Sequence, residues 1–148
     1  MVTDSDVEIL LVEDNPSDVE LTLHAFEANH LTNSVHVARD GEEALDFLFG
    51  DGEARKPRVI LLDLKLPKVD GLDVLRAIRA NAVTRLVPVV ILTSSREERD
   101  IVESYELGVN SYITKPIEFE KFLETVKTLG LYWLLLNEPP VPALASRG

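Results

Sequence analysis

Hydrophobic and polar positions along the chain form short apolar runs that alternate with longer amphipathic segments. The run from Val7 to Val12 ends at Glu13-Asp14-Asn15-Pro16, where proline marks the first turn of a helix. Val59 to Leu62 is apolar at every position, as expected for a central strand covered on both faces. This cycle repeats, and it predicts strands over 7–12, 34–38, 59–62, 87–92 and 109–114 and helices over 16–29, 40–50, 70–80, 96–107 and from about Ile117 onward.

Five strands that alternate with five helices predict a doubly wound α/β domain with one five-stranded parallel sheet, the flavodoxin-like class. Parallel neighbours need crossover connections, and the crossover helices must cover both faces of the sheet. Ligands of such sheets bind beyond the carboxyl ends of the strands. The polar residues expected at those ends are Glu13, Asp14, Asp63, Thr93 and Lys115.

Composition is that of one globular domain. The 148 residues are 45% hydrophobic and 28% charged, enough apolar surface for one core. We expect a domain over residues 1–136 with an extended last helix and a short tail over 137–148. The formal charge of -11 disfavours nucleic acid and anionic membranes as partners. Without cysteine, a membrane-length apolar run or a signal peptide, the chain is expected to be cytoplasmic.

Three carboxylates at neighbouring strand ends would repel one another strongly in a partly buried cleft, so they imply raised pKa values or a bound cation. Oxygen-only ligands in this number favour Mg²⁺, which often meets a phosphate group. Lys115 and the Thr93 hydroxyl are suitable donors to phosphoryl oxygens. Asp63 is the best placed phosphoryl acceptor, because Glu13 and Asp14 flank it from the first strand.

Each residue taken alone also has an ordinary structural explanation. These are a turn or helix cap for Asp14, Asp40, Asp63 or Thr93, and a solvated surface charge for Glu13 or Lys115. Their shared placement at one sheet edge favours a common site, because chance would scatter charged residues over both edges and the helix surfaces.

Four segments carry a family resemblance: LLVEDNP with Glu13 and Asp14, VILLDLKLPKVDGLDVL with Asp63, VVILTSS with Thr93, and SYITKP with Lys115. Thr93 and Lys115 follow Asp63 by 30 and 52 positions, as in that family. Over residues 7–129 the sequence resembles the response-regulator receiver domain of two-component signalling, the CheY-like fold. Its second half is similar to single-domain regulators that partner bacterial phytochrome histidine kinases.

The resemblance implies that Asp63 is the phosphoacceptor. It further implies that Asp14 and Asp63 bind Mg²⁺ directly, that Glu13 binds it through water, and that the Lys65 carbonyl is another ligand. Lys65 is a departure, because the family often has asparagine there. A cation two residues after the acceptor is expected to alter autodephosphorylation or access by a phosphatase.

The resemblance also implies a switch and a phosphodonor. A sensor histidine kinase would phosphorylate Asp63, Thr93 would turn toward the phosphoryl group, and Tyr112 would rotate inward from an exposed rotamer. The fourth helix, fifth strand and fifth helix would change as a result. The Lys115–Pro116 bond is expected to be cis. Such a protein is not an enzyme, although it assists its own phosphorylation and autodephosphorylation.

Three other functions fit parts of the pattern. A haloacid-dehalogenase-like phosphatase also uses an aspartate nucleophile with Mg²⁺, but it needs a second acid where this chain has Lys65. A flavodoxin-like cofactor binder needs a phosphate-binding loop after the first strand, where Glu13 and Asp14 would repel a phosphate. A phosphorylation-independent scaffold would not need the intact set of acids with Thr93 and Lys115.

Residues 119–134 show a core-facing helical stripe that includes Phe119 and Phe122, whereas residues 131–136 are apolar around most of the helix. We therefore expect a homodimer through Leu131, Tyr132, Leu135 and Leu136, unless residues 137–142 fold back over them. We expect no output domain after this short tail. The signal is therefore expected to leave by protein contact, for which a histidine phosphotransfer protein, occlusion of a target and a phosphate sink for the kinase are all compatible.

Overall fold

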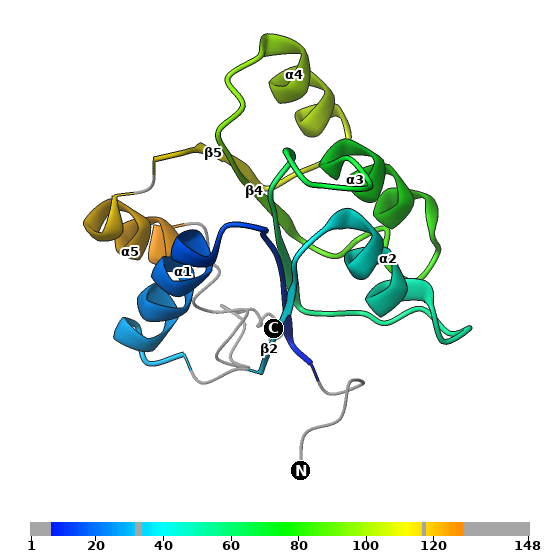
Figure 1. The fold of residues 1–148 in the computed structure, drawn as a ribbon, viewed down its shortest axis with the longest axis horizontal. Coiled ribbons are helices and arrows are strands. Elements are labelled where there is room, and N and C mark those ends of the chain that lie inside the picture. Colours follow the sequence, from blue (N-terminus) through cyan, green and yellow to red (C-terminus); the bar gives the residue numbers. More distant parts are fainter. Residues whose placement is uncertain (1–6, 32–33, 117, 129–148) are drawn as a thin grey trace, which may run out of the picture.

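The computed structural model describes residues 7–31, 34–116 and 118–128, in which five strands alternate with five helices (Figure 1). The strands form one sheet in the order β2-β1-β3-β4-β5, and all neighbours are parallel. The predicted doubly wound fold is confirmed. The elements are β1 (Ile9–Val12), α1 (Pro16–Ala28), β2 (Val35–Ala38), α2 (Gly41–Phe49), β3 (Val59–Leu62), α3 (Gly71–Ala80), β4 (Val89–Thr93), α4 (Glu98–Glu106), β5 (Ser111–Thr114) and α5 (Phe119–Thr128).

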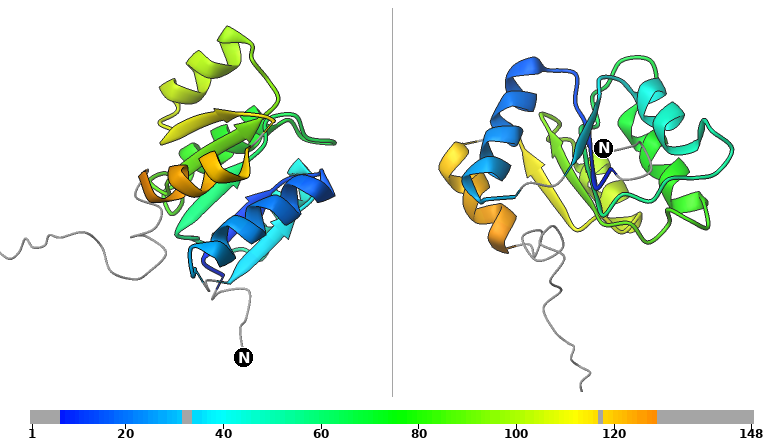
Figure 2. Two further views of the ribbon diagram at one scale, coloured as in Figure 1. Left: turned by 90° about the vertical axis from the view of Figure 1, so that its left-hand side faces the viewer. Right: turned by 90° about the horizontal axis from the view of Figure 1, so that it is seen from below.

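Helices cover both faces of the sheet. Helices α1 and α5 lie side by side on one face, and α2 and α3 lie on the other, with α4 next to α3 (Figures 1 and 2). Alternate residues of each strand enter the two cores: Ile60 and Leu62 pack toward α2 and α3, and Leu61 packs toward α1 and α5. Every residue of β1 and β3 is buried, which agrees with their continuous apolar sequence.

The register of the strands sets which polar residues become neighbours. Val12 of β1 pairs with Leu62 of β3, so Glu13 and Asp63 follow at the same level of the sheet. The backbone N–H of Asp63 donates to the Val12 carbonyl at 3.0 Å, and that of Lys115 donates to the Thr93 carbonyl at 2.8 Å. The carboxyl ends of β1, β3, β4 and β5 therefore meet along one edge.

Short polar residues and one glycine shape the connections at that edge. The Asn15 side chain accepts hydrogen bonds from the backbone N–H groups of Ser17 and Asp18 and so caps α1. Asp40 caps α2 in the same way, which confirms the cap interpretation for this residue. A Cβ atom at Gly71 would overlap the Asp63 carbonyl oxygen, so only glycine lets α3 begin this close to the end of β3.

Several element ends differ from the sequence prediction. The helix expected from Arg96 begins at Glu98. Before it, Ser95 lies in a loop, where its hydroxyl donates to Asp100 and its carbonyl accepts from the Tyr112 hydroxyl, so it is not part of a helix. Phe122 is buried as expected, but Phe119 is 36% exposed at the start of α5, so its assignment to the core stripe is wrong. A stripe assignment takes no account of the helix end, where the sheet no longer covers the side chain.

Residues 129–148 lie outside the described part of the chain. They include the predicted extension of the last helix, the predicted dimer residues Leu131, Tyr132, Leu135 and Leu136, and the predicted tail over 137–148. Among the helices in the described ranges, none combines the length and the apolar character that crossing a bilayer requires.

Candidate functional site

Three acidic side chains gather where β1 and β3 end. Glu13, Asp14 and Asp63 each offer one carboxylate oxygen, and these oxygens lie within 4.8 Å of one another. Glu13 is 2% exposed and Asp63 is 4% exposed, whereas Asp14 faces solvent. A set of carboxylate oxygens with one open side suits a hard divalent cation. The structure thus brings together the three acids that the sequence placed at this edge.

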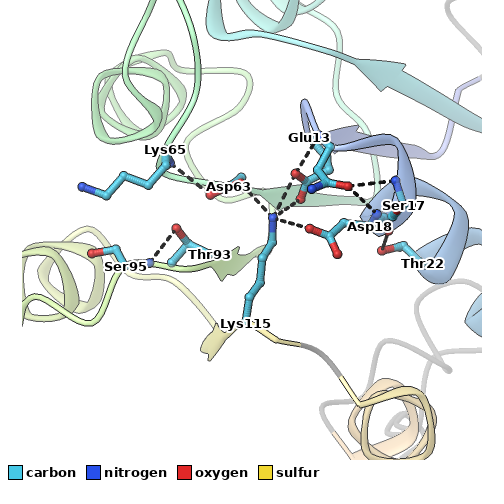
Figure 3. Close-up of polar contacts among 10 residues, drawn as sticks. Glu13, Ser17, Asp18, Thr22, Asp63, Lys65, Thr93, Ser95 and Lys115 are labelled. Carbon is cyan, nitrogen blue, oxygen red and sulfur yellow. Dashed lines mark hydrogen bonds and ion pairs between the residues drawn. The ribbon is translucent and has the colours of Figure 1, made fainter.

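Lys115 enters the same cluster from the end of β5 (Figure 3). Its Nζ lies 2.9 Å from Glu13 Oε2 and 3.0 Å from Asp63 Oδ2, and its side chain is 13% exposed. Burial alone would lower the pKa of Lys115, but hydrogen bonds to carboxylates outweigh that effect and raise the pKa. The side chain is therefore an ammonium ion at neutral pH. The Lys115–Pro116 bond is cis, as the resemblance implied.

Glu13 is an acid in a buried position. Its pKa is raised to about 7, mainly by burial and also by the Asp63 charge, while the Lys115 ammonium acts in the opposite direction. The backbone N–H of Asn15 also donates to Glu13 Oε2 at 3.1 Å. When Lys115 is the only cation in the cluster, the ionised form of Glu13 is therefore energetically unfavourable. A second cation at this position would relieve that cost.

Lys65 lies beside the acceptor position but does not point into the cluster. Its backbone N–H donates to Asp63 Oδ1 at 3.0 Å and so fixes the carboxylate orientation (Figure 3). Its side chain is 53% exposed, and its Nζ lies 3.9 Å from Asp100 Oδ2. The main chain of Lys65 is therefore placed at the site, while its charge is directed toward α4.

Thr93 and Tyr112, the two predicted switch residues, meet through Ser95. The Ser95 backbone N–H donates to Thr93 Oγ1 at 3.3 Å, and the Tyr112 hydroxyl donates to the Ser95 carbonyl at 3.0 Å. Thr93 is fully buried and does not cap α4. Tyr112 is half-buried, so the exposed rotamer expected for it is not the one in this structure. Its hydroxyl finds a backbone acceptor and thereby keeps the ring against the core.

Sequence reasoning missed three polar residues that touch this site. Asp18 Oδ2 lies 2.8 Å from the Lys115 Nζ. Ser95 Oγ donates to Asp100 Oδ2 at 2.5 Å, and both residues are 4% exposed. Asp18 carried one usable signal, its place in the first helical turn directly after the acidic pair. The contact of Asp100 with Ser95 carried none, because it depends on how the loop after β4 leads into α4.

Comparison with known proteins agrees with this geometry. The family model described as the response regulator receiver domain matches residues 9–127. The chain is 45% identical over 137 residues to "Probable methanogenesis regulatory protein FilR2" of Methanothrix harundinacea, with 91% of this chain and 88% of the relative covered. It is 40% identical over 129 residues to "Response regulator Rcp1" of Synechocystis, with 85% and 88% covered.

Two solved structures are similar across most of the chain. "Bacteriophytochrome response regulator RtBRR" is 52% identical with a TM-score of 0.73, and the match covers 95% of this chain and 87% of that one. The structure described as the Mn(2+)-bound form of response regulator Rcp1 is 37% identical with a TM-score of 0.76, and the match covers 91% and 99%. The likeness therefore extends over the whole fold, and one of the similar structures is described as a bacteriophytochrome response regulator.

Proposed function

This chain belongs to the response regulator receiver domain family, and from that membership we propose that it accepts a phosphoryl group on Asp63 from a sensor histidine kinase. Members of this family are signalling proteins of two-component systems, and the family as a whole implies a histidine kinase as partner. The observation that carries the assignment of Asp63 is its position: a buried carboxylate between two acids and one ammonium ion.

The residues around Asp63 suit in-line phosphoryl transfer. One Asp63 oxygen would form a bond to phosphorus while the bond from phosphorus to the kinase histidine nitrogen breaks. Lys115 would donate to an oxygen of the transferred group, and the Thr93 hydroxyl would donate to another. The backbone N–H of Lys65 keeps the remaining carboxylate oxygen in place. No general acid or base is assigned a role in this transfer.

The acid cluster fits Mg²⁺ by the chemistry of its donors, all of which are oxygens. Asp14 and Asp63 would be direct ligands, Glu13 would act through water, and the Lys65 carbonyl would complete the protein ligands. When bound, the ion would neutralise charge on the phosphoryl oxygens. The description of a related regulator as Mn(2+)-bound supports a divalent cation for this class of site.

The output is a shift of the surface formed by α4, β5 and α5. Ser95 connects the two switch residues, so a turn of Thr93 toward a phosphoryl oxygen would remove the acceptor of the Ser95 N–H. The loop after β4, in which the Ser95 carbonyl accepts a hydrogen bond from the Tyr112 hydroxyl, would then rearrange. We propose that this rearrangement carries the phosphorylation state to a protein partner, for which a histidine phosphotransfer protein is compatible.

A bacterial phytochrome histidine kinase is the proposed phosphodonor, supported by the similarity to RtBRR and Rcp1. Such a kinase would place the protein in the cytoplasm. A homodimer through residues 131–136 is also proposed, on the apolar pattern of that segment alone. Light scattering on the full chain tests the dimer, and a monomer at high concentration in both phosphorylation states would overturn it.

The phosphoacceptor is tested by incubating the protein with Mg²⁺ and acetyl phosphate. We expect one hydroxylamine-labile phosphate per chain, the signature of an acyl phosphate, and we expect it to disappear in Asp63→Asn. The matched control is Asp70→Asn, a residue before α3 that is outside the acid cluster, which should incorporate phosphate as the wild type does. Incorporation that persists in Asp63→Asn would overturn the assignment, and a wild type that takes up no phosphate would favour the scaffold function.

A further inference from the structure

Among the residues that the structure describes, Asp18 is the one contact of the Lys115 ammonium that does not belong to the acid triad (Figure 3). The ammonium has three N–H donors, and three carboxylates lie within 3.0 Å of it. Two of these carboxylates, Glu13 and Asp63, are the same groups that offer oxygens for a divalent cation. Lys115 therefore occupies the acids that a metal ion needs.

A dication and the ammonium cannot share Glu13 and Asp63 without a cost. Both are positive, and the acids are nearly fully buried, so solvent screens their repulsion only weakly. Lys115 must keep a partner when its hold on these acids is weakened, because an unpaired ammonium in a half-buried position is destabilised. The partner has to lie within reach of Nζ and outside the metal ligand set.

On these grounds we propose that Asp18 is a positioning residue that keeps the Lys115 ammonium paired while a divalent cation takes up Glu13 and Asp63. The proposal rests on the function proposed above and adds a residue to it. In Figure 3, Asp18 and Asp63 reach Nζ from opposite sides, Asp18 from α1 and Asp63 from the end of β3. The ammonium can shift its hydrogen bonds toward Asp18 without leaving the site.

The local structure keeps Asp18 in that role. It lies in the first turn of α1, where its backbone N–H donates to the Asn15 side chain at 3.2 Å. Its carbonyl accepts from Thr22 Oγ1 at 2.8 Å. A negative charge near a helix N-terminus interacts favourably with the helix dipole. Its side chain is 22% exposed, so it is less buried than Glu13 and Asp63 and costs less to keep charged.

The test is Mg²⁺ binding to the unphosphorylated protein, measured by isothermal titration calorimetry. We expect Asp18→Asn to weaken Mg²⁺ binding about tenfold, equivalent to about 1.4 kcal/mol. The Lys115 ammonium would then remain on Glu13 and Asp63 and compete with the ion. Glu20→Gln is the matched control, since it removes one exposed negative charge from the same helix. We expect it to change the affinity by less than about twofold.

A double-mutant cycle separates positioning from simple loss of charge. In a Lys115→Ala background the competing ammonium is absent, so Asp18→Asn should have no larger effect than Glu20→Gln. Asp18→Glu keeps a carboxylate on α1 and should recover part of the lost affinity in the wild-type background. Circular dichroism establishes that each variant is folded before titration.

The outcomes are distinct. Wild-type affinity in Asp18→Asn, or an equal loss with and without Lys115, would overturn the role of Asp18. In either of these cases the proposed function still stands if the wild type binds Mg²⁺ and takes up phosphate and Asp63→Asn takes up none. Only the inference about Asp18 then fails. A wild type that binds no Mg²⁺ at millimolar concentration would overturn both.

Discussion

The interior of the central strands and the carboxyl edge of the same strands are both buried, yet different interactions stabilise them. Residues Val59 to Leu62 of β3 are fully buried among aliphatic neighbours. One position further along the chain, Asp63 is 4% exposed and shares one ammonium with Glu13 and Asp18. The apolar contacts are non-directional, and each depends on volume. The charged contacts depend on the identity of every partner.

The difference determines how each region responds to change. A shortened side chain in the strands leaves a cavity whose cost is independent of pH and metal. A change at the edge alters a balance among charges of both signs, so its effect depends on pH, salt and bound cations. We therefore expect the strand interior to determine the stability of the fold. The charged edge is expected to lower the stability of the metal-free protein while providing a site that binds a cation.

The largest effect is expected in the strand interior. Leu61→Ala removes a fully buried side chain from β3, and we expect it to lower the free energy of unfolding by about 2–5 kcal/mol. Leu61→Met keeps the volume and should cost less than about 1.5 kcal/mol. Urea unfolding measures both. A smaller loss of stability in Leu61→Ala than in Leu61→Met would contradict the role given to the strand interior. So would a loss in Leu61→Ala that changes with Mg²⁺, provided that the folded variant binds the ion as the wild type does.

A smaller, pH-dependent effect is expected at Glu13. Its pKa is raised by burial to about 7 in the folded protein, from an ordinary value of 4.5. Stability from this group is then fully present below pH 4.5 and is lost as the pH rises through 7. Relative to Glu13→Gln, the wild type should lose about 2–3 kcal/mol of unfolding free energy across that window in a chelating buffer. Parallel pH profiles for the two proteins would contradict this prediction.

The smallest effect is expected at Asp14, and it has the opposite sign. Asp14 is exposed and offers a carboxylate oxygen within 4.8 Å of those of two buried acids. Asp14→Asn removes that repulsion, so the metal-free protein should become more stable by up to about 1 kcal/mol. The gain should shrink as salt is added and should be reversed by Mg²⁺, which stabilises only the wild type. Thermal unfolding with and without the ion measures it, and a loss of stability in the metal-free variant would show that the acids do not repel.

Much of the site was accessible from the sequence because it follows strand ends. Asp63 and Lys115 each come directly after a predicted strand, and parallel strands bring such positions to one edge. Residues on helices were not accessible in this way. The contact of Asp18 with Lys115 depends on how α1 begins and on the reach of two side chains. The inward position of Tyr112 depends on an acceptor in the loop after β4.

By itself, the sequence determined the order and type of the elements, the buried character of β1 and β3, and the set of acids at the carboxyl edge. These follow from local periodicity and from the geometry of parallel strands, both of which are written in neighbouring positions. Only the tertiary structure decided which carboxylates share the ammonium of Lys115, one of them 102 positions away. That pairing depends on the packing of separate elements and on side-chain reach, and no local pattern specifies either.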